Sequence, residues 1–569
     1  MSSLMILLGS IVIFIIAYFT YGSWLAKEWG VDPSIKTPAH VIDDGGVDYV
    51  PAKAPILLGH HFASIAGAGP INGPIQAAIF GWVPVLLWII IGGIFFGAVQ
   101  DFSAILVSIR HKGQSLGEVI EENVSHRCKV LFSIFAWLVL LLVVAAFADI
   151  VASSFNGFSV KDGQTVLNSA NGSVATASLL FIPLAVVFGY LVYRRNAPLI
   201  VSTIAGVVLL ALCITIGIYV PIHLSKNIWL GFIFVYIVVA SVTPVWILLQ
   251  PRDYLNSFLL YFMMIAALIG IVGTNPTVNI PATVGLTANG QPIFPFLFIT
   301  VACGAISGFH SIVGSGTTSK QLDNEKDAKM IGYGGMLIEC VLAVISLICI
   351  SSIGFAGAKG MAPPVVFASA IKVFFINLGF GEAAASVTYT VILLAISAFA
   401  LTSLDTATRL ARFIFQELFT EGGKQTSKNP LTNMYVSTII TVAIGGVLCL
   451  AGYQKIWPIF GACNQLVAVP AFLAVSVWLA RKGRNNKMFY FPMVFMLAAC
   501  LISLVMTFRL NISILAAGKG NMMVQGLQCI VIVPIFILAI FLVWEGVSCL
   551  IKISKEGPSK LGTSPAGGK

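Results

Sequence analysis

Residues 56–103 read ILLGHHFASIAGAGPINGPIQAAIFGWVPVLLWIIIGGIFFGAVQDFS, which is apolar enough for two membrane-spanning helices. Three glycines and two prolines interrupt the first half: Gly67, Gly69, Pro70, Gly73 and Pro74. Proline removes a backbone donor and glycine adds backbone freedom, so these residues predict a broken helix. Inside a bilayer, such a break persists only where protein or a polar cavity satisfies the freed backbone groups. We therefore expect the functional site at this break.

The composition of the whole chain is that of a polytopic membrane protein. Of its 569 residues, 58% are hydrophobic and 9% are charged, whereas soluble proteins carry roughly a quarter charged residues. The net charge of +10 does not call for a nucleic-acid partner, because Lys and Arg gather in the cytoplasmic loops of membrane proteins. The expected partners are the lipid bilayer and a small-molecule substrate.

About fifteen segments are long and apolar enough to cross a bilayer, which predicts an all-α membrane protein. They are residues 4–24, 57–81, 83–109, 130–155, 177–193, 198–220, 229–249, 255–273, 293–318, 331–356, 386–408, 433–450, 457–480, 489–510 and 526–550. With the N-terminus outside and the C-terminus cytoplasmic, 25 of the 32 Lys and Arg residues fall on the inner side. Residues 358–384 are interfacial, re-entrant or spanning. The first segment is a retained helix rather than a signal peptide, since no basic residue precedes it.

A second interruption lies five helices after the first, in segment 229–249, at Ser241, Thr243 and Pro244. Two five-helix units of opposite orientation, each opening with a discontinuous helix, form the LeuT-type inverted repeat of ion-coupled transporters. Alternatively, Pro244 only kinks its helix. The predicted division is an N-terminal helix and linker (1–56), two repeats (57–224 and 225–410), accessory helices (411–551) and a disordered tail (552–569).

Ionisable residues inside a bilayer are costly, so each one in a predicted span is a candidate functional residue. Five lie there: Asp101, Asp149, His310, Glu339 and Asp405. Asp101 and Glu339 have no basic neighbour in sequence and must find a partner on another helix or hold a proton. Asp405 lies four residues before Arg409, which predicts a structural ion pair. Asp149 lies near the outer surface, where water can solvate it.

Coupling of transport to an ion has candidates of two kinds, for H⁺ and for Na⁺. His60 and His61 begin the broken helix, and histidine changes charge near neutral pH. They are either proton-coupling groups or interfacial residues. Ser307, Ser311 and Ser315 are spaced four residues apart, which predicts one hydroxyl stripe on a helix face. This stripe either supplies oxygen ligands to sodium or only permits tight helix packing.

Enzyme signatures are absent from the sequence. It contains no Walker lysine motif, GxSxG elbow, HExxH or Rossmann fingerprint. We therefore expect no enzyme activity, no organic cofactor and no firm metal site, and we expect an ion or substrate gradient to supply the energy. The competing class is a non-transporting membrane sensor or a channel.

Four strings together resemble the signature of the carbon starvation protein A (CstA) family: GHHFASIAGAGPINGPIQA, ISGFHSIVGSGTTSKQLDNEKDAKMIGYGGMLIE, LTSLDTATRLARFIFQE and WPIFGACNQLVA. They follow the family order and cover residues 56–470. The resemblance implies a bacterial or archaeal inner-membrane transporter related to the amino acid–polyamine–organocation superfamily. It also implies uptake of peptides when carbon is scarce, or of pyruvate together with protons, as in some relatives.

These observations predict an ion-coupled symporter for a peptide or a pyruvate-like monocarboxylate. The outer half-helix, expected to begin between residues 72 and 75, would attract a carboxylate through its unpaired amides and dipole. The predicted substrate-binding residues are Gly67, Gly69, Pro70, Asn72, Gly73, Ser241 and Thr243. The predicted cation- or proton-coupling residues are His60, His61, Asp101, His310, Ser311, Ser315 and Glu339.

Overall fold

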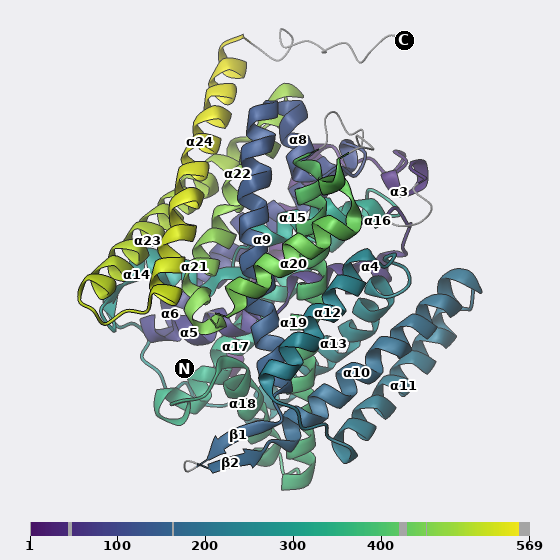
Figure 1. The fold of residues 1–569 in the computed structure, drawn as a ribbon, viewed down its shortest axis with the longest axis vertical. Coiled ribbons are helices and arrows are strands. Elements are labelled where there is room, and N and C mark those ends of the chain that lie inside the picture. Colours follow the sequence, from purple (N-terminus) through teal and green to yellow (C-terminus); the bar gives the residue numbers. More distant parts are fainter. Residues whose placement is uncertain (1, 44–47, 162–163, 420–428, 451, 557–569) are drawn as a thin grey trace.

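The computed structural model describes residues 2–43, 48–161, 164–419, 429–450 and 452–556, and these residues form one bundle of helices (Figure 1). In chain order, the first half contains α1 (Ser3–Phe19), α2 (Tyr21–Trp29), α3 (Pro38–Val41), α4 (Ala54–Ile65), α5 (Gly69–Ala77), α6 (Trp82–Gly92), α7 (Ala98–Arg110), α8 (Leu116–Asn123), α9 (His126–Phe155), α10 (Ser169–Gly189), α11 (Leu199–Tyr219), α12 (Lys226–Val242) and α13 (Leu249–Thr274). The second half contains α14 (Ile293–Val301), α15 (Gly308–Val313), α16 (Ser319–Gln321), α17 (Gly335–Gly357), α18 (Pro363–Asn377), α19 (Glu382–Glu417), α20 (Met434–Cys449), α21 (Tyr453–Leu466), α22 (Ala468–Arg481), α23 (Tyr490–Ala516) and α24 (Leu527–Glu556).

The helical character of the chain agrees with the sequence, with two additions. Two short antiparallel hairpins, β1 (Phe158–Lys161) with β2 (Gln164–Leu167) and β3 (Thr287–Ala288) with β4 (Gln291–Pro292), lie in connecting segments. In addition, α24 continues to Glu556, so the prediction of a disordered tail from residue 552 is wrong for its first five residues. Residues 557–569 lie outside the described part of the chain.

Twelve helical runs among the described residues are long and apolar enough to cross a membrane. Each of the fifteen segments expected from the sequence is helical over most of its length. Three of them do not count among the twelve, because α12 and α20 are short and residues 54–77 are divided into two helices. Within residues 358–384, which were expected to be interfacial, re-entrant or spanning, residues 363–377 form the fifteen-residue helix α18. This helix is also shorter than the twelve candidate spans.

The predicted broken helix is present, but its break lies earlier than the proline pattern suggested. Helix α4 ends at Ile65 and α5 begins at Gly69, so the interruption covers residues 66–68 rather than 67–74. Pro70 occupies the first turn of α5, where a helix has no use for the missing N–H. The Gly-Pro sequence therefore starts a helix here.

The helix of segment 229–249 is interrupted at Thr243 and Pro244, as predicted, but the interruption ends α12 instead of dividing one run into two half-helices. Helix α12 ends at Val242, Thr243 is extended (φ −78°, ψ 138°), and a turn leads into α13. A residue before proline avoids the helical conformation, which here ends the helix. The second broken run is α14–α15, which is interrupted at residues 302–307, where Ala302 has φ 45° and ψ −124°.

The two broken runs pack directly against each other. Helix α5 lies against α14 and against residues 302–304. A Cβ on Gly73 would lie 2.2 Å from the carbonyl oxygen of Val301, so only glycine permits this approach. The long helices α9 and α19 pack along each other beside the breaks, whereas α10 and α11 form a peripheral pair at one edge of the bundle (Figure 1).

Candidate functional site

The break in the α4–α5 run presents unpaired backbone amides. In the described part of the chain, the N–H groups of Gly67, Ala68, Gly69 and Ile71 make no hydrogen bond. Pro70 has no N–H group to offer. A helix N-terminus with free amides and a favourable dipole is suited to an anionic group. The unpaired amides therefore lie at residues 67–71, earlier than the start at residues 72–75 expected for the outer half-helix.

The break in the α14–α15 run differs from the first, because side chains from other helices make hydrogen bonds to some of its polar groups. The side chain of Asn464, on α21, accepts a hydrogen bond from the Phe309 N–H at 2.8 Å and donates one to Ser307 Oγ at 2.9 Å. Gln100, on α7, donates a hydrogen bond to the Ser307 carbonyl oxygen at 2.6 Å. Asn464 and Gln465 are adjacent amides in an apolar span, a pattern that predicts hydrogen bonds across helices, and Asn464 makes them. The N–H groups of Ser307 and Gly308 make no hydrogen bond among the described residues, so both breaks retain backbone donors.

Next to these amides, Asn72 faces a small cavity. Its side chain is 1% exposed, and neither its amide nitrogen nor its oxygen has a hydrogen-bond partner among the described residues. The cavity has a volume of about 120 Å³ and lies between α5, α9, α10, α18 and α19. Its polar lining consists of Asn72, Ser153, Ser154, Asn171 and Ser397. A larger cavity of about 440 Å³, lined by Ile75 and Gln76, shares Ala362 with it.

Glycines hold the first break close to its neighbours. A Cβ on Gly67 would lie 2.6 Å from Ser403 Oγ on α19, and one on Gly69 would lie 2.6 Å from the Cys303 Cβ in the second break. Ser403 also donates a hydrogen bond to the carbonyl oxygen of Ser64, the next-to-last residue of α4. The two breaks and the middle of α19 thus meet at one place.

A buried group of two carboxylates and one histidine joins α7, α15 and α17. His310 Nδ1 lies 2.9 Å from Asp101 Oδ2, and His310 Nε2 lies 3.6 Å from Glu339 Oε2. All three side chains are fully buried, and both Glu339 oxygens lack a hydrogen bond among the described residues. Asp101 and Glu339 find their partner on another helix, as predicted, and that partner is His310. All three side chains are ionisable, and none of them contacts solvent in this structure.

His60 and His61 are not interfacial, so that interpretation is wrong. Both are fully buried because α4 lies inside the bundle against α13 and the α15 region. His60 Nδ1 lies 2.9 Å from Asp253 Oδ2, and His61 Nδ1 lies 2.8 Å from Thr318 Oγ1. Each histidine therefore connects the first half-helix to a neighbouring helix.

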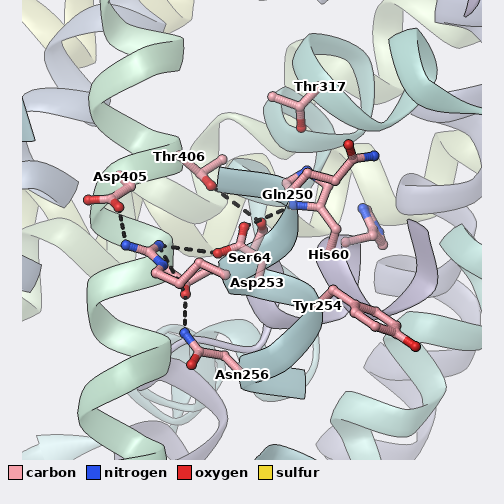
Figure 2. Close-up of polar contacts among 12 residues, drawn as sticks. His60, Ser64, Gln250, Asp253, Tyr254, Asn256, Thr317, Asp405 and Thr406 are labelled. Carbon is pink, nitrogen blue, oxygen red and sulfur yellow. Dashed lines mark hydrogen bonds and ion pairs between the residues drawn. The ribbon is translucent and has the colours of Figure 1, made fainter. Parts of the chain in front are cut away.

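A buried arginine occupies the junction of α4, α12, α13 and α19 (Figure 2). Arg252 donates hydrogen bonds to Asp405 on α19 and to Tyr236 on α12, to Asp253 at 3.1 Å and to Thr402 at 3.2 Å. Figure 2 shows the labelled side chains of Asp405, Asp253 and Asn256 gathered around this junction. The predicted ion pair between Asp405 and Arg409 is therefore wrong, because a guanidinium from another helix reaches Asp405 instead.

Arg409 makes its hydrogen bonds to a different helix, α12. It donates to the carbonyl oxygens of Ala240 (3.0 Å) and Thr243 at the end of α12, and its Nη1 lies 3.4 Å from Asp48 Oδ1. The predicted substrate residues Ser241 and Thr243 thus lie at this helix end. No hydrogen bond described for either residue reaches α5.

The serine stripe does not form as predicted. Helix α15 begins only at Gly308, and Ser307 is extended, so the stripe loses its first member. Ser311 and Ser315 donate to carbonyl oxygens of their own run, of Gly308 at 2.7 Å and of Ser311 at 2.8 Å. These contacts favour packing over a cation site.

Asp149 is not left to water either. It is 4% exposed and pairs with Lys226 at 2.7 Å. Arg252 and Asp253 are not among the residues predicted from the sequence, because QPRDY is typical of a loop between spans. The signal was an adjacent charged pair at the start of an apolar helix, which the structure places in the first two turns of α13.

The family model described as carbon starvation protein CstA matches residues 2–366 and 354–503. The chain belongs to the CstA family. The peptide transporter CstA of Escherichia coli is 34% identical over 562 residues, covering 85% of this chain and 78% of that protein. The pyruvate/proton symporter BtsT of the same organism is 31% identical over 577 residues, with the same coverage of both chains.

Among solved structures, a manganese transporter of Eremococcus coleocola in complex with an aromatic bis-isothiourea compound is similar to this CstA-family chain. The TM-score is 0.51 at 11% identity, over 92% of this chain and 99% of that one. At this identity the likeness concerns the fold. A search of the described residues finds no group of three or more His, Cys, Asp or Glu side chains arranged to hold a metal ion.

Proposed function

We propose that this CstA-family protein is a proton-coupled symporter that imports a small carboxylate. The observation that carries the proposal is the set of unpaired amides at residues 67–71 beside the unpartnered Asn72 and its cavity. Amides at a helix start bind a carboxylate, and the amide of Asn72 can bind a second polar group of the same molecule.

A monocarboxylate of three or four carbons suits this cavity best. This cavity, of about 120 Å³, is the smaller of the two beside α5, the other measuring about 440 Å³. The residues lining it include no Asp or Glu that would pair with the ammonium group of a peptide. The name of one relative, pyruvate/proton symporter, agrees with this choice. A peptide is the second candidate, favoured by the adjoining cavity of about 440 Å³ and by the relatives named peptide transporters.

Protons are the proposed coupling ion, and Asp101, His310 and Glu339 are the proposed proton site. Two carboxylates that share one histidine favour an additional proton, because that proton makes the buried group neutral. Sodium would need the oxygen atoms near the end of α4. There the guanidinium of Arg252 already lies against Thr402 and Asp405.

An inverted repeat is also part of the proposal, with units that differ from the sequence prediction. The first unit is α4–α5, α6–α7, α9, α12 and α13, with α10–α11 inserted. The second is α14–α15, α17, α19, α20 and α21–α22. Equivalent contacts support this division: α9 packs on α19, α12 on α19 as α20 on α9, and α4 on α13 as α15 on α22. The transporter would cross the inner membrane fifteen times, with its N-terminus outside and its C-terminus in the cytoplasm.

Direct binding tests this assignment. Purified protein in detergent should bind radiolabelled pyruvate saturably, and Asn72→Ala should weaken binding about tenfold, since it removes hydrogen bonds to an ionised ligand. Asn485→Ala, in the loop after α22, is the control and should bind as wild type does. Equal binding by the wild type and Asn72→Ala would contradict the site.

A further inference from the structure

We propose that Arg412 forms a second anion site, at the end of α19 opposite the Asn72 cavity, and that it receives the carboxylate of the substrate as it leaves. This inference rests on the proposed transport of a carboxylate. It assigns a role to a buried cation that the substrate and proton sites do not use.

Arg412 is a buried guanidinium that forms no ion pair with any described residue, Asp48 lying beyond ion-pair distance. It is 2% exposed, and its Nε and Nη2 atoms have no hydrogen-bond partner among the described residues. No carboxylate of the described residues lies within ion-pair distance of it, whereas Arg409 is paired with Asp48. Burying an ion without a partner costs several kcal/mol, so such a group is retained where it binds something. Two parallel N–H donors match the two oxygens of a carboxylate.

A second cation stands beside Arg412. The guanidinium carbon of Arg412 lies 4.2 Å from the centre of the Phe413 ring, and Lys320 Nζ lies 4.5 Å from the same centre. The ring thus has a positive group at each of two positions. Both cations would attract an anion that reaches this end of α19.

Polar side chains on α19 connect this place to the first break. Four residues spaced three apart form a winding ridge on the helix: Ser403, Thr406, Arg409 and Arg412. All four are at most 2% exposed. Since a helix rises 1.5 Å per residue, the ridge is roughly 13 Å long. It begins at Ser403, which bonds the Ser64 carbonyl oxygen beside the break, and it ends at the unpaired guanidinium.

The ridge is closed in this structure. Ser64 Oγ lies 3.3 Å from Thr406 Oγ1, and the two hydroxyls face each other in Figure 2. Arg409 holds the end of α12 and Asp48 together. Movement of α4 away from α19 would separate Ser64 from Thr406 and expose the start of the ridge, which winds half a turn around α19 before it reaches Arg412. A carboxylate that leaves the amides of residues 67–71 would then meet the free guanidinium.

The test compares affinity at the two faces of the membrane. Pyruvate uptake is measured in right-side-out and in everted membrane vesicles, which present opposite faces to the added substrate. For Arg412→Gln, the KM at the face where α19 ends should rise about tenfold or more, since a charged hydrogen-bond partner is lost. The KM at the other face should stay at the wild-type value. Arg412→Lys keeps the charge and should restore part of the affinity.

Three results would overturn the inference. The first is an unchanged KM for pyruvate at that face in Arg412→Gln. The second is an equal loss of affinity at both faces, which a structural role of Arg412 predicts. The third is a rise in KM that appears only in vesicles rich in anionic lipid. Absence of carboxylate uptake by the wild type at either face would instead overturn the proposed function.

Discussion

Replacing Gly73 with alanine tests whether the contact between the two broken runs sets the transport site. The added Cβ would lie 2.2 Å from the Val301 carbonyl oxygen and 2.7 Å from its carbon, both backbone atoms. Ordinary Cβ contacts begin at 3.4 Å. Backbone cannot rotate away as a side chain can, so α5 and α14 must separate by about 1 Å, a shift that can cost on the order of 100-fold in activity. Overpacking of this kind costs ~1–3 kcal/mol of stability.

We therefore expect Gly73→Ala to reach the membrane as folded protein but to transport on the order of 100-fold more slowly. The assay is the initial rate of labelled pyruvate uptake in proteoliposomes, with a thermal melt of the purified protein beside it. Gly9→Ala, also within a helix but with open space around the new Cβ, is the matched control and should transport normally. A wild-type rate in Gly73→Ala, with its stability unchanged, would refute the argument from close packing.

Three further predictions follow from the buried contacts. Glu339→Gln leaves a neutral pair of Asp101 and protonated His310. Uptake should therefore lose its dependence on a pH gradient, whereas exchange of labelled for unlabelled substrate should persist. Gradient-driven uptake like that of the wild type would contradict this prediction. Asn464→Ala removes the side chain that caps α15 and should cost about 1 kcal/mol, which lowers the melting temperature of a chain of this length by about 1 °C. Unfolding at the same temperature as the wild type would exclude a capping role. Arg252→Gln leaves Asp405 buried without its cation and should cost ~3–5 kcal/mol, with little folded protein recovered; normal recovery by size-exclusion chromatography would argue against the network.

Hydropathy alone predicted most of the helices, because an apolar run in a bilayer must satisfy its backbone internally and therefore becomes helical. The break after α4 was also predictable, since glycine and proline act locally. The predicted position of this break is wrong by a few residues, because Pro70 is compatible with the first turn of a helix. The same reasoning correctly required a partner on another helix for Asp101 and Glu339.

Tertiary contacts determine what the sequence did not reveal. The second break, at residues 302–307, contains no proline, and it persists because Asn464 and Gln100 bond its backbone groups from other helices. Pairing within one helix, which spacing suggests for Asp405, gave way to Arg252, which lies 153 positions earlier in the chain. Spacing reports neighbours on one helix only, so it cannot identify partners of this kind.

Gradient-driven uptake by purified protein in proteoliposomes tests the central claim most directly. Labelled pyruvate, alanine and a dipeptide are offered separately, with a pH gradient or a sodium gradient imposed alone. The account predicts that pyruvate accumulates above its external concentration with an inwardly directed proton gradient, and that a sodium gradient has no effect. Equilibration without accumulation, as in a channel, or accumulation driven by sodium alone would contradict it.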